Sequence, residues 1–263
     1  MVLGNIKEYT KALKEQFKER IAILGDAPRL AIIQVGNLEA SNRYIKNKIK
    51  DCEEVGIIAE HYGFDNDITE VELIEEIRAI AEFADGVIVQ LPLPPHIRSS
   101  IATAAIPAEK DVDGFRTDSP YAPATPGGIM KYLRACEFDF TGKDVVIIGR
   151  SDIVGKPLAA MMTAADATVT LCHSKSKLSH HLYSADLIVT AVGKAGFLNC
   201  YPIHVPVIDV GINFDENGKL CGDCFNIEGR DVTPVPGGVG LLTRCALLEN
   251  VIEAKARKCL KRG

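Results

Sequence analysis

Short runs of apolar, β-branched residues alternate with segments of helical periodicity along most of the chain. The first part contains predicted helices at 5–24, 40–55 and 69–83 and predicted strands at 29–35, 57–64 and 86–94. Such an alternation is typical of βαβ units, in which the strands lie parallel. The sequence therefore predicts an α/β fold with parallel sheets.

The same alternation returns after a polar, proline-containing stretch at 116–128, which we interpret as a linker. Beyond it we predict a helix opened by Pro126 that reaches about Cys136, a helix at 155–165, and strands at 144–149, 168–173, 186–193 and 205–212. A chain of 263 residues is long enough for two domains. We predict a first domain at 1–118, completed by a C-terminal helix at 240–263, and a second domain at 119–239.

Composition narrows the possible partners. The net charge of -5 comes from mixed signs without a basic block, so no nucleic-acid partner is expected. The first twenty residues carry charges every few positions, which predicts neither a signal peptide nor a membrane span, and we expect a cytoplasmic protein that binds a small molecule. Eight scattered cysteines, most with apolar neighbours, fit free thiols in a reducing compartment.

Only Cys221-Gly222-Asp223-Cys224 has the spacing of metal ligands or of a redox pair. There is no second pair of this kind and no nearby pair of histidines to complete a zinc site. We therefore expect no metal, and we interpret this stretch as a turn between short strands.

The segment 145–162 reads as an apolar strand, a tight turn that begins at Gly149, and a helix that begins near Gly155. Glycine lets a phosphate approach the backbone closely, and the free N–H groups at a helix N-terminus can bind it. The spacing is G-x5-G instead of the usual G-x-G-x-x-G, so a purely structural turn remains an alternative.

The end of the next predicted strand bears on the choice of cofactor. An NAD site commonly has an acidic residue there, which binds the ribose hydroxyls. This chain has Cys172-His173-Ser174-Lys175-Ser176-Lys177, without a carboxylate and with several donors. Together with Arg150 and Ser151 these residues suit a 2′-phosphate and favour NADP, although an ordinary hydrophilic loop would have a similar composition.

The segment Ser41–Lys48 has a tyrosine four residues before a lysine on a predicted helix. Helical phase puts Lys48 at the border of an apolar stripe with Tyr44 one turn back, while Lys46 and Lys50 point to the solvated side. A lysine that merely lays its stem along apolar surface would show the same phase. Short-chain dehydrogenases have a similar Tyr-x-x-x-Lys pair, but it follows the nucleotide-binding turn, whereas here it precedes it.

Nine short motifs, in order, make the sequence resemble the bifunctional methylenetetrahydrofolate dehydrogenase/methenyltetrahydrofolate cyclohydrolase family. They run from about residue 41 to 250. The motifs are Ser41-x-x-Tyr44-x-x-x-Lys48, "VQLPLP" at 89–94, "KDVDGF" at 110–115, "PATPGGIM" at 123–130, "GRSDIVGKP" at 149–157, "ATVTLCHSKS" at 167–176, "ADLIVTAVG" at 185–193, "VIDVGIN" at 207–213 and "TPVPGGVG" at 233–240.

The resemblance implies two reactions. 5,10-Methylenetetrahydrofolate is oxidised to the methenyl form with NADP, and the methenyl form is hydrolysed to 10-formyltetrahydrofolate. It implies that Lys48 is the central acid/base and electrostatic residue, that Gln90 bonds Lys48, that Asp113 holds the pterin, and that Tyr44 stacks on the folate. By themselves, Gln90 would be an amide at a strand end and Asp113 a turn-forming residue.

The resemblance also implies a set of further contacts and an architecture. Pro236, Gly237 and Gly238 belong to a loop near nicotinamide and folate. The implied NADP contacts are Thr125, Gly149, Arg150, Ser151, Ser174, Gly193 and Ile212. The implied fold has two α/β domains, the second of Rossmann type, with the active-site cleft between them and a C-terminal helix that returns to the first. Homodimers are implied through the second domain.

One departure from the family pattern concerns the segment after Asp113. The family usually has a longer segment there with a Gly-Arg-Leu element, which "FRTDSPYA" lacks. Two rival hypotheses stay open: a monofunctional dehydrogenase and a catalytically silent nucleotide-binding protein. The presence of Lys48 and Gln90 argues against the monofunctional dehydrogenase. An oxidoreductase of the shikimate or malic type would not explain Tyr44, Gln90 and Asp113 together.

Overall fold

The computed structural model describes residues 3–225 and 231–260, and contacts within the chain divide it into two compact units. The 12–124 unit consists of Ala12–Ala124 and Arg244–Gly263, and the 125–243 unit consists of Met1–Lys11 and Thr125–Thr243. The domain prediction from the sequence differs, because it places residues 1–11 in the first domain and residues 240–243 in the C-terminal helix of that domain. The difference arises because helices α1 (Ile6–Leu24) and α8 (Val239–Leu260) continue past the division between the units.

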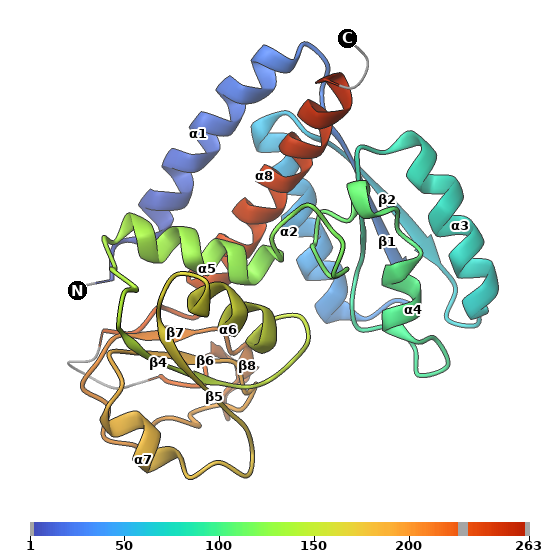
Figure 1. Ribbon diagram of the computed structural model, residues 1–263. Helices are drawn as coiled ribbons and strands as arrows, with labels where there is room; N and C mark the ends of the chain where they lie inside the picture. Colours follow the sequence, from blue (N-terminus) through green and yellow to red (C-terminus); the bar gives the residue numbers. More distant parts are fainter. Residues whose placement is uncertain (1–2, 226–230, 261–263) are drawn as a thin grey trace. The chain divides into compact units, whose positions relative to one another are not determined.

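The 12–124 unit is built on a three-stranded parallel sheet (Figure 1). Its strands are β1 (Arg29–Val35), β2 (Ile58–Phe64) and β3 (Gly86–Val89), in the order β2-β1-β3. Helices α3 (Glu70–Phe83) and α4 (Ser99–Ala104) share a core with one face, and α1, α2 (Glu39–Val55) and α8 share a core with the other. Both faces are covered, which explains why the middle strand reads as one apolar run.

The start of α3 is as the sequence predicts. Thr69 is the N-cap, its hydroxyl oxygen accepts a hydrogen bond from the N–H of Glu72 at 3.2 Å, and the Glu72 carboxylate accepts from the N–H of Thr69 at 2.9 Å. The predicted strand at 86–94, by contrast, ends at Val89. Proline has no N–H for a sheet ladder, so "LPLPP" continues as an irregular segment.

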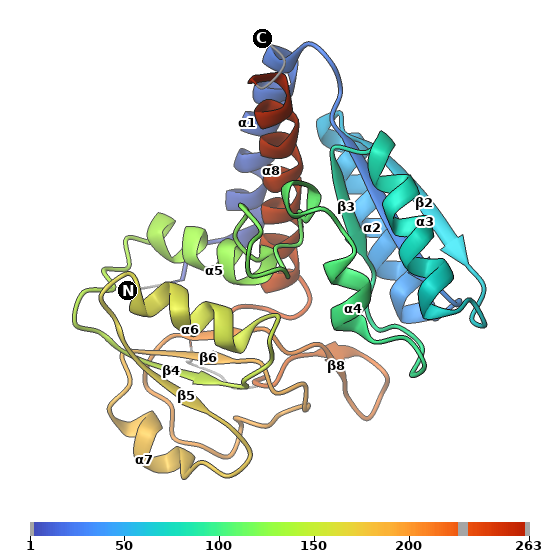
Figure 2. The same cartoon turned by 45° about the vertical axis from the view of Figure 1, so that its right-hand side comes forward.

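The 125–243 unit contains a four-stranded parallel sheet (Figure 2). Its strands are β4 (Asp144–Ile148), β5 (Thr168–Cys172), β6 (Leu187–Thr190) and β7 (Val207–Asp209), in the order β5-β4-β6-β7. Helices α5 (Ala124–Ala135) and α6 (Gly155–Thr163) share a core with one face, and α7 (Leu178–Tyr183) with the other. This is the doubly wound arrangement expected of a nucleotide-binding domain.

Several predicted boundaries in this unit need correction. The strands predicted at 186–193 and 205–212 are shorter, because the chain leaves the sheet into glycine-containing turns. Pro126 is the third residue of α5 and not its first, a position where a missing N–H still costs no helical hydrogen bond. The sequence analysis missed both six-residue helices, α4 and α7.

The stretch from Cys221 to Cys224 is not the turn of a hairpin. The hairpin consists of β8 (Asn213–Phe214) and β9 (Leu220–Cys221), and its turn lies between these strands, so the stretch follows the hairpin. Both cysteines are buried, and neither forms a disulfide. Over the described ranges 3–225 and 231–260, no three His, Cys, Asp or Glu side chains gather as metal ligands would.

Helix α8 packs its apolar side into the core of the 12–124 unit. The buried residues are Cys245, Ala246, Leu247, Leu248, Val251, Ile252 and Ala254. The predicted return of the C-terminal helix to the first domain is thus confirmed, while residues 261–263 of the prediction lie outside the described part. Among the described residues, no helix has the length and apolarity required to span a membrane.

Candidate functional site

In the 12–124 unit the strand order reverses between β1 and β3. The chain leaves β1 toward β2 on one side, while β3 lies on the other side of β1. Open parallel sheets bind ligands where the strand order reverses in this way. Gln90 directly follows β3, and α2, which follows β1, carries Tyr44 and Lys48.

Lys48 and Gln90 are in direct contact. The Lys48 Nζ donates a hydrogen bond to Gln90 Oε1 at 3.1 Å. The other end of the amide is fixed as well, because Gln90 Nε2 donates to the Leu91 carbonyl oxygen at 2.8 Å. A carbonyl can only accept, so this bond determines which end of the amide faces the lysine. The backbone N–H of Gln90 donates to the Ile33 carbonyl oxygen at 2.8 Å and thereby extends the pairing of β1 and β3.

Asp113 is brought to the same place by a segment that follows the edge of β3. Asp111 forms a parallel bridge with Val87. The segment lies so close that a Cβ on Gly86 would be 2.7 Å from Val112 Cγ1. The Asp113 side chain is buried, and burial raises the pKa of its carboxyl, while the positive charge of Lys48 acts in the opposite direction. Lys48, Gln90 and Asp113 thus form one polar group.

Tyr44 lies one helical turn before Lys48 and remains 37% exposed. Partial burial raises the pKa of its hydroxyl, and the charge of Arg43 lowers it. Lys46 and Lys50 are exposed, as the helical phase predicts. The tyrosine ring is therefore available to a ligand that binds beside Lys48.

In the 125–243 unit the strand order reverses between β4 and β6. The turn after β4 has no room for side chains: a Cβ on Gly149 would be 2.4 Å from the Ala191 carbonyl oxygen, and one on Gly155 would be 1.9 Å from the Gly149 carbonyl oxygen. Gly149 also has a φ of 119°. A cradle of bare backbone before the N-terminus of α6 suits the phosphates of a dinucleotide.

The side chains around this turn supply donors. Ser151 Oγ accepts hydrogen bonds from the N–H groups of Val154 at 3.2 Å and Gly155 at 3.4 Å. Arg150 is exposed, and so are Ser174 and Lys175 in the turn after β5. No acidic residue ends β5, so the turn carries the donor set that a 2′-phosphate needs.

Two buried carboxylates hold the remaining loops. Asp223 accepts hydrogen bonds from the Thr190 hydroxyl at 2.8 Å and from the backbone N–H groups of Val192, Gly193 and Lys194 at 2.7, 3.3 and 2.9 Å. Asn213 donates to the same carboxylate at 3.0 Å. Asp223 thus joins the loop with Gly193 to the loop with Ile212.

Asp209 in turn holds the segment that contains Asp223. It accepts hydrogen bonds from the N–H groups of Gly211, Asp223 and Cys224 at 2.9, 3.1 and 2.8 Å. Burial raises the pKa of Asp209 to about 6, against the lowering effect of these N–H groups and in the same direction as the charge of Asp223. Neither carboxylate was predicted from the sequence as a structural residue. The sequence signals are Gly211 and Gly222, because the Asp223 carboxylate occupies the space of a Cβ on Gly211 and the Asp209 carboxylate that of a Cβ on Gly222.

The other predicted cofactor residues lie near the division between the units. The Thr125 hydroxyl is within 2.9 Å of the Thr243 hydroxyl, which donates to the Val239 carbonyl oxygen at 3.1 Å. Pro236, Gly237 and Gly238 form the loop that precedes α8, and Gly237 has a φ of 100°. Thr125 and this loop therefore converge on the first turn of α8.

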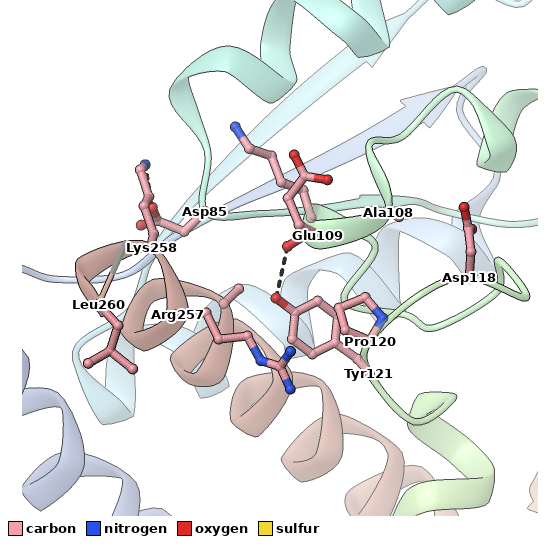
Figure 3. A pocket seen from close by; sticks show the side chains of 11 residues that line it. Asp85, Ala108, Glu109, Asp118, Pro120, Tyr121, Arg257, Lys258 and Leu260 are labelled. Atoms are coloured by element: carbon pink, nitrogen blue, oxygen red, sulfur yellow. Dashed lines mark hydrogen bonds and ion pairs between the residues drawn. The ribbon is translucent and has the colours of Figure 1, made fainter. Parts of the chain in front are cut away.

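The shortened segment after Asp113 borders a different pocket, of about 690 Å³ (Figure 3). It lies at the amino end of β3, where Asp85 lines it, whereas Gln90 lies at the carboxyl end. Figure 3 shows Tyr121 with its hydroxyl donating to the Glu109 carbonyl oxygen at 2.8 Å. Lys258 is paired with Asp85 at 2.7 Å, and Arg257 with Glu253. This pocket is separate from the Lys48 group.

Two family models together match most of the chain. The model described as "Tetrahydrofolate dehydrogenase/cyclohydrolase, catalytic domain" matches residues 5–113. The one described as "Tetrahydrofolate dehydrogenase/cyclohydrolase, NAD(P)-binding domain" matches residues 123–259. The chain belongs to the tetrahydrofolate dehydrogenase/cyclohydrolase family.

Individual members of this family are similar over their full length. The bifunctional protein FolD of Dechloromonas aromatica is 41% identical over 274 aligned residues, which cover 96% of each chain. The structure of the bifunctional enzyme from Campylobacter jejuni has a TM-score of 0.92 and 41% identity, and covers 97% of this chain and 98% of that one. The Trypanosoma brucei enzyme, complexed with NADP cofactor and inhibitor, has a TM-score of 0.90 and 30% identity, and covers 98% of each.

The chain is therefore an NADP-dependent methylenetetrahydrofolate dehydrogenase and methenyltetrahydrofolate cyclohydrolase, and its substrates are tetrahydrofolate derivatives. The predicted fold class of two α/β domains, the second of Rossmann type, is confirmed. The 274 aligned positions outnumber the 263 residues of the chain, so the relative has residues at places where this dehydrogenase/cyclohydrolase has none.

Replacing Asp223 by alanine should destabilise the NADP-binding unit. The change leaves three backbone N–H groups and the Thr190 hydroxyl without their acceptor. We expect a loss of at least about 3 kcal/mol in the free energy of unfolding, measured by urea denaturation. Glu216→Ala removes an exposed carboxylate from the neighbouring hairpin and should change the stability by less than about 0.5 kcal/mol. Equal stabilities of the two variants would contradict this account of Asp223.

Proposed function

We propose that Lys48 is the acid/base of the cyclohydrolase reaction and that Gln90 and Asp113 hold the lysine and the folate for it. The observation that carries this proposal is the hydrogen bond of 3.1 Å between Lys48 Nζ and Gln90 Oε1 at the end of β3. Because the amide is also tied to Leu91, it presents a fixed acceptor to the lysine. The fixed acceptor holds the Lys48 Nζ in place, and general acid–base catalysis requires a side chain positioned in this way.

In the hydrolytic step, water adds to the methenyl carbon and loses a proton, and the bond from that carbon to the ring nitrogen then breaks. The amine of Lys48 accepts the proton from the water, and the resulting ammonium returns it to the ring nitrogen as that nitrogen leaves. Gln90 keeps the Lys48 side chain in place during both transfers. The methenyl substrate is a cation, so the second proton of the water is released as the carbinol oxygen becomes the formyl carbonyl. The net reaction consumes one water molecule and yields 10-formyltetrahydrofolate and one proton.

Asp113 and Tyr44 are proposed to hold the folate. A carboxylate accepts paired hydrogen bonds from the amide and amino groups of a pterin edge. Asp113 is buried next to Lys48, so this contact would place the folate beside the lysine. The exposed ring of Tyr44 provides a surface on which the flat part of the folate can stack.

In the dehydrogenase step, NADP would supply the acceptor for the hydride that leaves the methylene bridge. The backbone at Gly149 and Gly155 is proposed to cradle its phosphates, and Arg150, Ser151 and Ser174 to bind the 2′-phosphate. Further contacts to NADP are proposed from Thr125, Gly193 and Ile212. Pro236, Gly237 and Gly238 are proposed to bind the folate substrate. The fit is supported by the close approach of bare backbone in this turn and by the donors around it.

The partners and the location of the enzyme are also proposals. We propose a homodimer through the second domain, supported by the family resemblance. The cysteines of the described residues form no disulfides, which supports a reducing compartment such as the cytoplasm. The shortened segment after Asp113 is held by hydrogen bonds, since Arg116 N–H donates to Asp111 Oδ2 at 2.8 Å and Asn250 Nδ2 donates to the Ala122 carbonyl oxygen at 3.0 Å.

The Lys48→Ala variant should lose cyclohydrolase activity by at least a hundredfold, because it removes the group proposed to take the proton of the attacking water. The protein should still fold and bind NADP, since the NADP-binding residues lie in the other unit. The measurements are the rate of methenyl hydrolysis and the thermal shift on adding NADP.

Lys46→Ala is the matched control, because it removes an exposed lysine from the same helix. It should hydrolyse the methenyl substrate at the wild-type rate. Hydrolysis by Lys48→Ala at a rate near wild type would show that the role assigned to Lys48 is wrong.

A second variant tests the 2′-phosphate site. Ser174→Asp places a carboxylate in the turn after β5, where it repels the 2′-phosphate of NADP and can accept hydrogen bonds from the ribose hydroxyls of NAD. We expect kcat/KM for NADP to fall at least tenfold and the ratio of NAD to NADP activity to rise. Ser179→Asp adds the same charge at an exposed position of α7 and should leave this ratio unchanged. An unchanged ratio in Ser174→Asp would argue against this site.

A further inference from the structure

Asp51 is a buried carboxylate on the same helix as Lys48. It follows the lysine by three residues and is only 5% exposed. Side chains three residues apart on a helix are neighbours, so Asp51 is an available ion partner for Lys48. The structure instead gives Lys48 the amide of Gln90 as its hydrogen-bond acceptor.

Both oxygens of Asp51 are taken by cations from other helices. Lys14 on α1 donates from Nζ to Oδ1 at 2.7 Å. Arg244 on α8 donates from Nε to Oδ2. Lys14 also pairs with Glu54 at 2.6 Å. Burial acts to lower the pKa of Lys14, but its hydrogen bonds to the two carboxylates raise it overall, so the lysine stays charged.

The buried thiol of Cys52 lies beside Asp51 in the chain. Burial and the charge of Asp51 raise the pKa of Cys52 to about 12, against the lowering effect of the charge of Lys48. A carboxylate three residues along the same helix can compete with Gln90 for the N–H donors of Lys48. A hydrogen bond to an ionised acceptor is stronger than one to an amide. If Asp51 had no other cation as a partner, Lys48 would therefore bond Asp51 instead of Gln90.

We propose that Lys14 and Arg244 are positioning residues for Lys48 that act through Asp51. By occupying both oxygens of the carboxylate, they leave Lys48 directed at Gln90 and at the folate. The inference rests on the proposed role of Lys48 in the cyclohydrolase reaction. It assigns a function in catalysis to two cations that touch neither substrate nor cofactor.

The test is a loss of activity that a further mutation reverses. The double variant Lys14→Met/Arg244→Met frees Asp51, so that Lys48 turns to it. We expect kcat for methenyl hydrolysis to fall at least tenfold, with KM changed by less than threefold. Adding Asp51→Asn removes the competing charge and should restore kcat to within threefold of wild type. If Lys14 and Arg244 only stabilised the fold, the double variant would lose thermal stability, while the protein that remains folded would keep the wild-type kcat.

The chain offers a matched control around Asp85. This buried carboxylate is also paired with two lysines of α8, Lys258 at 2.7 Å and Lys255 at 3.9 Å, but it lies at the other end of β3 from Gln90. Lys255→Met/Lys258→Met should therefore leave kcat for hydrolysis within threefold of wild type. A tenfold loss in this control would overturn the inference, since any uncompensated buried carboxylate would then have the same effect.

Two further results would overturn the inference: wild-type kcat in the folded double variant, or no recovery in the triple variant. If the double variant does not fold, Arg244→Met alone frees Oδ2 and should show a smaller loss that Asp51→Asn reverses. A separate result bears on the role of Lys48. If Lys48→Ala hydrolyses the methenyl substrate normally, the proposed function fails, whatever the variants at Lys14 and Arg244 do.

Discussion

The hydrogen bond between Lys48 and Gln90 is the interaction on which the proposed catalytic site depends. It exists because β1 and β3 are parallel neighbours, so that the residue after β3 faces the helix that follows β1. The register is held by the backbone bond from Gln90 to Ile33, and the amide is oriented by its bond to Leu91. Asp113 reaches the same place because Gly86 lets its segment approach β3.

The NADP-binding unit also has its candidate site at the carboxyl ends of two neighbouring parallel strands, with different residues. Its sheet also reverses its strand order, between β4 and β6, and the backbone there is kept bare by Gly149 and Gly155. Buried carboxylates complete the arrangement, because Asp223 gathers the N–H groups of the loop after β6. Each site thus consists of side chains and loops at the carboxyl ends of parallel strands, where no further strand residue competes for their hydrogen bonds.

Features that depend on local sequence could be predicted. The capping box of Thr69 and Glu72, the apolar strands and the separation of Lys48 from Lys46 and Lys50 follow from periods and spacings of a few residues. The predicted strand at 86–94 extends five residues beyond the end of β3 at Val89, because the apolar pattern continues into the proline-containing segment. The roles of the polar residues came from the family resemblance and not from these periods.

Features that depend on distant segments could not be predicted. Asp51 looks like an ordinary charged residue in "KDCEEV", and its partners Lys14 and Arg244 come from the two ends of the chain. Asp223 lies within Cys221-Gly222-Asp223-Cys224, whose spacing suggests a role for the cysteines and none for the aspartate. Its partners lie about thirty residues earlier, in the loop after β6. Helical phase tells which residues share a face, but it does not tell what that face meets in the folded protein.

The most direct test of the central claim is the rate of methenyl hydrolysis by the Gln90→Met variant, followed by absorbance. Methionine has nearly the shape of glutamine but cannot accept a strong hydrogen bond, so the variant removes the acceptor of Lys48 and little else. The account predicts that kcat for hydrolysis falls at least tenfold, while the thermal stability and NADP binding of the protein stay near wild type. A kcat equal to that of the wild type would show that the bond from Lys48 to Gln90 does not position the catalytic lysine.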